Sequence, residues 1–163
     1  MEYFNRKNYV NQLEMWRDKK VVKVITGIRR SGKSTLMLLF QRQLRANGVD
    51  ESHIISVNFE DVASEPLLEY HALYDYVSER IEDDAQYYIF FDEIQQVTGF
   101  ERVVDSLQLR QNVDIYVTGS NAKFLSKDVI TEFRGRGWEI RIHPLSFKEY
   151  YEEYAARYAL SDN

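Results

Sequence analysis

Residues 27–35 read Gly-Ile-Arg-Arg-Ser-Gly-Lys-Ser-Thr and directly follow the apolar run 21–26. The segment fits the pattern G-x-x-x-x-G-K-S/T at every fixed position. Its two glycines let the backbone turn tightly, so that successive N–H groups converge on phosphate oxygens, and the helix that follows points its positive end at the same anion. The sequence therefore predicts a strand, a phosphate-binding loop and a helix, which together form a nucleotide site.

The side chains of this loop receive different roles. Lys33 is expected to reach the outer phosphates, and Ser34 to hold Mg²⁺. The pattern does not require Arg29 or Arg30, whose side chains face solvent, a partner or nucleic acid, so neither is assigned a catalytic role. The predicted nucleotide-binding positions are Gly27, Arg30, Ser31, Gly32, Lys33, Ser34 and Thr35.

The composition is that of an ordinary globular domain. A chain of 163 residues suits a single domain, and no apolar stretch approaches the length of a membrane span. The first residues lack the apolar core of a secretion signal and the chain has no cysteine, so a cytoplasmic location is expected. The net charge of -5 argues against a surface dedicated to nucleic acid, although a local basic patch leaves DNA binding open.

Five short apolar runs alternate with helical patterns, which predicts a three-layer α/β/α fold with a parallel sheet. The strands are predicted at 21–26, 54–59, 87–91, 113–117 and 138–142. The helices are predicted from the phosphate loop to Asn47, from near Pro66 to Ile81, over 100–111 and 122–133, from Ser146 onward and over 3–17. The helix that opens near Pro66 is expected to bury Leu67, Tyr70, Tyr74, Val77 and Ile81.

Two carboxylates, Asp92 and Glu93, end the third apolar run. At the carboxyl edge of a parallel sheet, Asp92 is expected to bind the Mg²⁺ shell, and Glu93 to orient or deprotonate the water that attacks a γ-phosphate. The alternative is that the two residues only cap a turn after a buried strand. The phosphate loop upstream favours the catalytic interpretation.

Small polar residues follow the fourth run. Asn121 is the best candidate for a sensor of the γ-phosphate or the attacking water, because an amide both donates and accepts hydrogen bonds. Thr118 and Ser120 are alternatives, and Ser120 or Asn121 could instead cap the next helix. Further along, Arg134 and Arg136 either project into the nucleotide site of another subunit or lie in a solvated turn.

These pieces resemble the AAA+ superfamily and, more narrowly, a family of predicted bacterial and archaeal ATPases. The matching segments are 25–35, 58–61, 91–95, 118–120 and 144–147. The resemblance implies a five-stranded parallel sheet in the order 5-1-4-3-2, with ATP as the nucleotide and Mg²⁺ as its metal. It also implies that residues 1–163 form one core domain without a lid, the N-terminal portion of a longer protein.

The leading hypothesis is an ATPase whose Mg²⁺-dependent hydrolysis drives a conformational change or assembly, with possible homo-oligomers that share Arg134 or Arg136. Its predicted catalytic residues are Lys33, Glu93 and Asn121, and its metal ligands are Ser34 and Asp92. The alternative is an ATP-held switch or scaffold with negligible turnover that engages protein or DNA. A small-molecule kinase ranks lower, because the paired carboxylates suit water activation better.

Overall fold

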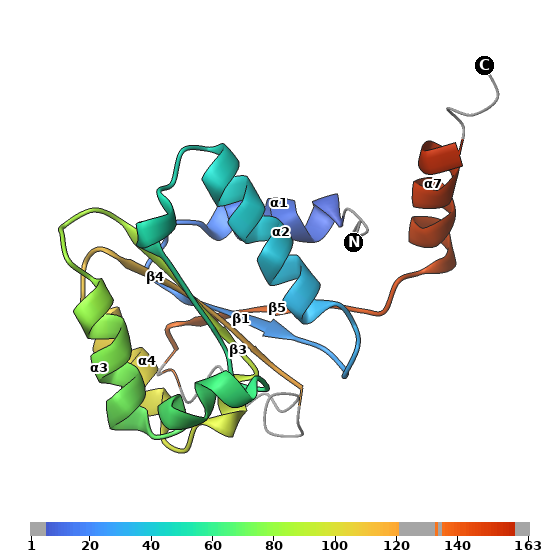
Figure 1. Cartoon of the computed structure of the whole chain (residues 1–163). Coiled ribbons are helices and arrows are strands. Elements are labelled where there is room, and N and C mark those ends of the chain that lie inside the picture. Colours follow the sequence, from blue (N-terminus) through green and yellow to red (C-terminus); the bar gives the residue numbers. More distant parts are fainter. Residues whose placement is uncertain (1–5, 121–132, 134, 159–163) are drawn as a thin grey trace.

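The computed structural model describes residues 6–120, 133 and 135–158. A parallel five-stranded sheet forms the middle layer, and its strands are ordered β2-β3-β4-β1-β5 (Figure 1). The strands are β1 (Val22–Thr26), β2 (Ile54–Asn58), β3 (Tyr87–Asp92), β4 (Val113–Gly119) and β5 (Gly137–Arg141). This sheet confirms the predicted fold class and strand order. The strands β1, β3 and β4 are buried along their whole length, as is typical of a parallel sheet covered on both faces.

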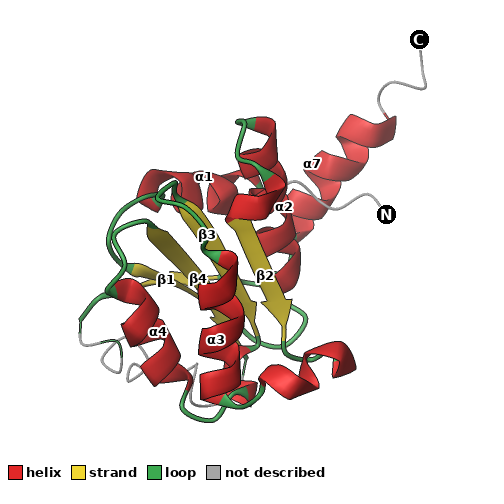
Figure 2. Ribbon diagram, turned by 60° about the vertical axis from the view of Figure 1, so that its left-hand side comes forward, coloured by secondary structure: helices red, strands yellow, loops and turns green. Residues whose placement is uncertain are grey.

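Helices cover both faces of the sheet (Figures 1 and 2). The first pair, α1 (Lys7–Trp16) and α2 (Lys33–Ala46), encloses a core with one face of the sheet, and α3 (Tyr70–Arg80) and α4 (Phe100–Gln108) enclose another with the opposite face. The helix α2 begins inside the phosphate loop and ends before Gly48, whose φ of 92° fits a left-handed helix terminus. None of the helices in the described part of the chain is long and apolar enough to cross a membrane.

The start of α3 differs from the prediction of a helix that opens near Pro66. Pro66 belongs instead to a short 3-10 helix, Val62–Leu67, and α3 begins after Glu69. The Glu69 carboxylate accepts hydrogen bonds from the backbone N–H groups of residues 71 and 72, at 3.1 and 2.9 Å, and this cap fixes the helix start. As a result Leu73 and Val77 are the buried residues of α3, while Tyr70, Tyr74 and Ile81 are only partly buried.

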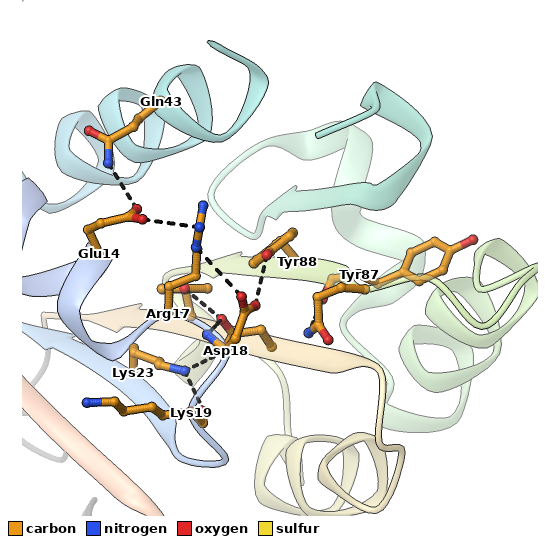
Figure 3. Close-up of polar contacts among 11 residues, drawn as sticks. Glu14, Arg17, Asp18, Lys19, Lys23, Gln43, Tyr87 and Tyr88 are labelled. Carbon is orange, nitrogen blue, oxygen red and sulfur yellow. Dashed lines mark hydrogen bonds and ion pairs between the residues drawn. The ribbon is translucent and has the colours of Figure 1, made fainter. Parts of the chain in front are cut away.

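A buried polar network lies toward the amino ends of β1 and β4 (Figure 3). The Lys23 ammonium is fully buried and donates hydrogen bonds to the carboxylate of Asp114 and to the carbonyl oxygen of Lys19. The Tyr116 hydroxyl and the Asp18 backbone N–H donate to the other oxygen of Asp114, at 2.8 and 2.9 Å. Burial lowers the pKa of Lys23 and raises that of Asp114, and each charge opposes the shift of the other. The network fastens the loop between α1 and β1 to the sheet.

The C-terminal helix α7 (Phe147–Tyr158) stands away from the sheet and its covering helices (Figure 1). Its start is the predicted capping box, because Ser146 N–H donates to the Glu149 carboxylate at 2.8 Å and Glu149 N–H donates to the Ser146 hydroxyl at 3.1 Å. All residues of α7 lie in the described part of the chain, and none of them is buried. The helix therefore has little packing to fix its orientation.

Candidate nucleotide site

The phosphate loop connects β1 to α2 at the carboxyl edge of the sheet. A Cβ atom on Gly27 would lie 2.6 Å from the carbonyl oxygen of Ile142 and 2.6 Å from the hydroxyl of Ser31, so a side chain does not fit there. Gly32, directly before α2, has a φ of 97°, which favours glycine. Glycine is therefore required at position 27 because neighbouring atoms leave no room for a side chain, and it is favoured at position 32 by the backbone conformation.

Lys33 is the first residue of α2, and its side chain is buried over the loop. The ammonium donates hydrogen bonds to the carbonyl oxygens of Gly27 and Ile28, at 3.0 and 2.9 Å. Burial lowers the pKa of Lys33, and the negative charges of Glu93, Asp92 and Glu60 oppose that shift. The positive charge of Lys33 is therefore placed among the carboxylates that end the neighbouring strands.

Thr118, on β4, holds both carboxylate residues that end β3. Its hydroxyl donates to the Asp92 carboxylate at 2.5 Å and accepts a hydrogen bond from the backbone N–H of Glu93 at 2.9 Å. All three residues are buried. Thr118, considered in the sequence as an alternative sensor, thus fixes the position of Asp92 and of the Glu93 backbone.

The Glu93 carboxylate is held by two polar side chains. The Ser120 hydroxyl donates to it at 2.9 Å, and the Gln95 amide donates to the same oxygen. The backbone of Glu93 has a φ of 58°, a left-handed conformation that is uncommon for a residue other than glycine. The turn after β3 therefore directs this side chain toward the loop rather than along the strand.

A surface cavity of about 380 Å³ lies over the phosphate loop. It is lined by Arg29, Arg30, Gly32, Lys33, Ser34, Thr35, Glu60 and Glu93. The exposed side chain of Arg29 forms an ion pair with Glu60 at 3.7 Å. Sequence analysis did not assign Glu60 to the site, although its place directly after β2 puts it at the same edge as Asp92.

The residues present fit a magnesium ion bound with a nucleotide. Among the described residues, no three histidine or carboxylate side chains group together as a metal site. Mg²⁺ in nucleotide sites takes one or two protein oxygens and completes its shell with phosphate and water. The hydroxyl of Ser34 and the carboxylate of Asp92 supply oxygens of the required kind at this edge of the sheet.

Three further residues were predicted for the site, and the structure describes one of them, Arg136. Asn121 and Arg134 lie outside the described residues, as do residues 122–132 of the helix expected over 122–133. Arg136 is exposed, and its carbonyl oxygen accepts a hydrogen bond from Val22 N–H at the amino end of β1. Arg136 therefore lies at the opposite edge of the sheet from Lys33 and contributes nothing to the cavity of its own chain.

Arg6 was missed by sequence analysis and touches the phosphate loop. Its buried guanidinium donates a hydrogen bond to the carbonyl oxygen of Ser31 at 2.8 Å. Nothing in the local sequence signals this contact, because the two residues are 25 positions apart. The phosphate loop is thus held from outside as well as by its own hydrogen bonds.

Comparison with known proteins agrees with this geometry. A family model described as an AAA domain matches residues 19–151. The chain is 37% identical over 147 residues to an uncharacterized protein of Haemophilus influenzae, which covers 90% of this chain and 37% of that protein. The chain therefore spans about a third of the length of this relative.

Solved structures share the fold. A Walker-type ATPase of Pyrococcus abyssi superposes with a TM-score of 0.67 at 17% identity, over 98% of this chain and 59% of the other. The ORC1 protein of Aeropyrum pernix, solved in complex with DNA, gives a TM-score of 0.69 at 15% identity, over 98% and 50% of the two chains. The family match, the phosphate loop and the strand order lead to one conclusion: the chain belongs to the AAA domain family and is an AAA+ P-loop ATPase domain.

Proposed function

We propose that this domain binds ATP with Mg²⁺ and hydrolyses it, and that hydrolysis drives a conformational change or assembly of a longer protein. The observation that carries the proposal is that Lys33 and Glu93 line the same cavity. Lys33 begins α2, and Glu93 directly follows β3, so the sheet fixes both positions. A cation and a carboxylate at the end of parallel strands are what phosphoryl transfer to water requires.

The chain's own groups divide the work as follows. Backbone N–H groups of residues 30–35 bind phosphate oxygens, and Lys33 exchanges its bonds to the carbonyl oxygens of Gly27 and Ile28 for bonds to phosphate. Ser34 and Asp92 would hold Mg²⁺, which would neutralise charge on the phosphates when bound. Glu93 accepts a proton from the attacking water or orients it, and Thr118 keeps the carboxylates in place. Asn121 remains a proposed sensor.

Calorimetry with Mg²⁺ and ATP tests the binding half of the proposal. Lys33→Ala should weaken ATP binding about a hundredfold, because charge-assisted hydrogen bonds contribute about 1.5–3 kcal/mol each. Lys148→Ala removes an exposed lysine of α7 and serves as the control. Equal affinities in the parent and in Lys33→Ala would refute the site.

Phosphate release tests the hydrolytic half. Glu93→Gln should keep ATP bound and lower turnover about a hundredfold or more, since it removes the acceptor for the proton of water. Glu65→Gln, an exposed carboxylate in the 3-10 helix before α3, is the matched control. Turnover at the parental rate in Glu93→Gln would rule out the role given to Glu93.

A second function is favoured by the hydrogen bonds of Glu93. Ser120 and Gln95 both donate to one oxygen of its carboxylate, so that oxygen is already engaged by the protein and must release these donors before it can bind an attacking water. A domain held in this state would retain ATP and act as a switch that presents a surface to protein or DNA. A parent protein that forms a stable complex with unhydrolysed ATP would support the switch, and steady phosphate release would support the ATPase.

A further inference from the structure

Arg6 is the most buried arginine of the described residues, and it contacts three separate parts of the chain. Its side chain is 5% exposed, and it lies directly before α1. One terminal nitrogen donates to the Ser31 carbonyl oxygen at 2.8 Å, and the other donates to the carbonyl oxygen of His143 at 2.7 Å and to the carboxylate of Glu149 at 3.3 Å. The guanidinium thus joins the phosphate loop, the segment after β5 and the first turn of α7.

The contact with the loop is close on more than one atom. A Cβ atom placed on Gly32 would lie 3.3 Å from a terminal nitrogen of Arg6, so the guanidinium rests against the residue that precedes α2. Ser31 and Gly32 are both phosphate-loop residues, and the Ser31 N–H donates to the carbonyl oxygen of Ile28 at 3.1 Å, an acceptor that it would have to leave in order to bind a phosphate. Any shift of the Ser31 backbone is transmitted to the guanidinium, because a planar group with fixed donors cannot follow one acceptor without turning toward or away from the others.

The contact with α7 involves a helix none of whose residues is buried. Glu149, in the first turn of α7, forms the ion pair with Arg6. Arg6 Nε is also buried without a hydrogen-bond partner among the described residues. The charge of the guanidinium is therefore compensated by the hydrogen bonds of its terminal nitrogens and by the ring of Tyr9, whose centroid lies 4.6 Å from Cζ. Glu149 is the one carboxylate that forms an ion pair with Arg6 among the described residues.

We propose that Arg6 is a positioning residue that couples the phosphate loop to α7, so that the orientation of α7 changes with nucleotide occupancy. This coupling rests on the proposed nucleotide binding. It adds the contacts through which nucleotide occupancy would change the orientation of α7. Binding free energies are reciprocal, so whatever turns α7 also changes the affinity of the loop for nucleotide. In this proposal α7 both responds to nucleotide and regulates the site.

The chain has no cysteine, which permits a direct distance measurement. Spin labels on Ala46→Cys at the end of α2 and Ala156→Cys on α7 report the position of α7 relative to the domain, because both positions are exposed. Mg²⁺ with ATP should shift and narrow the distance distribution. The same labelled protein with Glu149→Ala should bind ATP and show no shift.

A matched control separates the contact between Arg6 and Glu149 from the capping of α7. Ser146→Ala removes the hydroxyl that accepts from the Glu149 N–H and leaves the contact between Arg6 and Glu149. Glu149→Ala removes that contact and the other capping bond, from the Ser146 N–H to the carboxylate. The nucleotide-dependent shift should survive in Ser146→Ala. Arg6→Ala should lose the shift and bind ATP about tenfold more weakly, the size expected for one lost hydrogen bond from a charged group. If Arg6→Ala fails to fold, the pair of variants in α7 decides the question.

The possible failures are distinguishable. If the parent binds ATP and shows no shift, or if it binds ATP and Glu149→Ala keeps the parental shift, the coupling is wrong and the nucleotide site stands. If the parent binds no ATP, the proposed function fails and coupling to nucleotide fails with it. The distance distribution without nucleotide then still tests the contact between Arg6 and Glu149. It should broaden in Glu149→Ala and remain narrow in Ser146→Ala.

Discussion

The two edges of the sheet both bury charged side chains, and they do so differently. At the amino edge, Lys23 and Asp114 form a buried ion pair. A neighbouring hydroxyl and a backbone N–H also donate to the carboxylate of Asp114. At the carboxyl edge, Lys33 donates to carbonyl oxygens of its own loop and to no other residue that the structure describes, and Glu93 lines the same open cavity. The first set of charges is satisfied inside the protein, and the second faces a space that a ligand can enter.

This difference separates a structural polar cluster from a functional one. A buried ion pair whose hydrogen bonds are complete fixes the positions of the segments it joins, and removal of one partner leaves an uncompensated charge. A buried cation beside carboxylates that do not neutralise it by direct contact is suited to bind an anion with a metal. Substitutions at the two edges should therefore change different measured quantities.

The largest effect is expected at the amino edge. Lys23→Met should lower the free energy of unfolding by about 3–5 kcal/mol, because Asp114 is then buried without its cation. Urea denaturation measures this loss, and ATP affinity of the folded variant should stay at the parental value. Lys20→Met, on an exposed neighbouring lysine, is the control and should lose much less. Parental stability in Lys23→Met would contradict the structural role of the pair.

An intermediate effect is expected for the residue that braces the carboxyl edge. Thr118→Val keeps the shape and removes the hydroxyl, which leaves the Glu93 N–H buried without an acceptor and should cost about 1–3 kcal/mol of stability. Turnover should fall about tenfold through misplacement of Asp92 and Glu93, the effect of one lost hydrogen bond on the transition state. Thr26→Val removes a hydroxyl that donates to Glu139 on β5, so it should lower stability with a smaller loss of turnover. Equal turnover losses in both variants would show that Thr118 acts only on stability.

The smallest effect is expected at the rim of the cavity. The Arg29 side chain is 81% exposed, and its ion pair with Glu60 is 3.7 Å long. Exposed pairs contribute about 0–1 kcal/mol, so Arg29→Ala should change stability by less than that and ATP affinity by at most about fivefold. Glu60→Gln, which weakens the same pair from the other side, should behave alike. A loss of ATP binding equal to that of Lys33→Ala would instead make Arg29 a phosphate ligand.

The sequence predicts most of the fold because its signals are local. Five apolar runs, a phosphate-loop pattern, Asn47-Gly48 and the Ser146–Glu149 capping box each act within a few residues, and the structure has strands, a loop, a helix end and a helix start at these places. The start of α3 was predicted too early, because Pro66 is compatible with a first helical turn and the cap by Glu69 was not recognised. Pro66 and Glu69 are both typical of a helix start, and only the structure shows that α3 uses Glu69.

Contacts between distant residues could not be predicted in this way. Lys23 and Asp114 lie inside apolar runs and were predicted only as strand residues. They form a buried ion pair, but they are 91 positions apart, so no local pattern links them. Arg6 reaches residues 25, 137 and 143 positions away, and no spacing rule covers such distances. The site residues of the loop and of β3 could be named because parallel strands bring their carboxyl ends to one edge.

The backbone of Glu93 has a wider consequence. Its φ of 58° places a residue with a Cβ atom in a conformation that costs roughly 1–2 kcal/mol more than the right-handed one, and glycine would adopt it without that penalty. A glycine at position 93 would relieve the strain and remove the carboxylate from the cavity. The protein is therefore less stable at this turn than its fold permits, and selection for thermal stability alone would act against the residue on which the proposed chemistry depends.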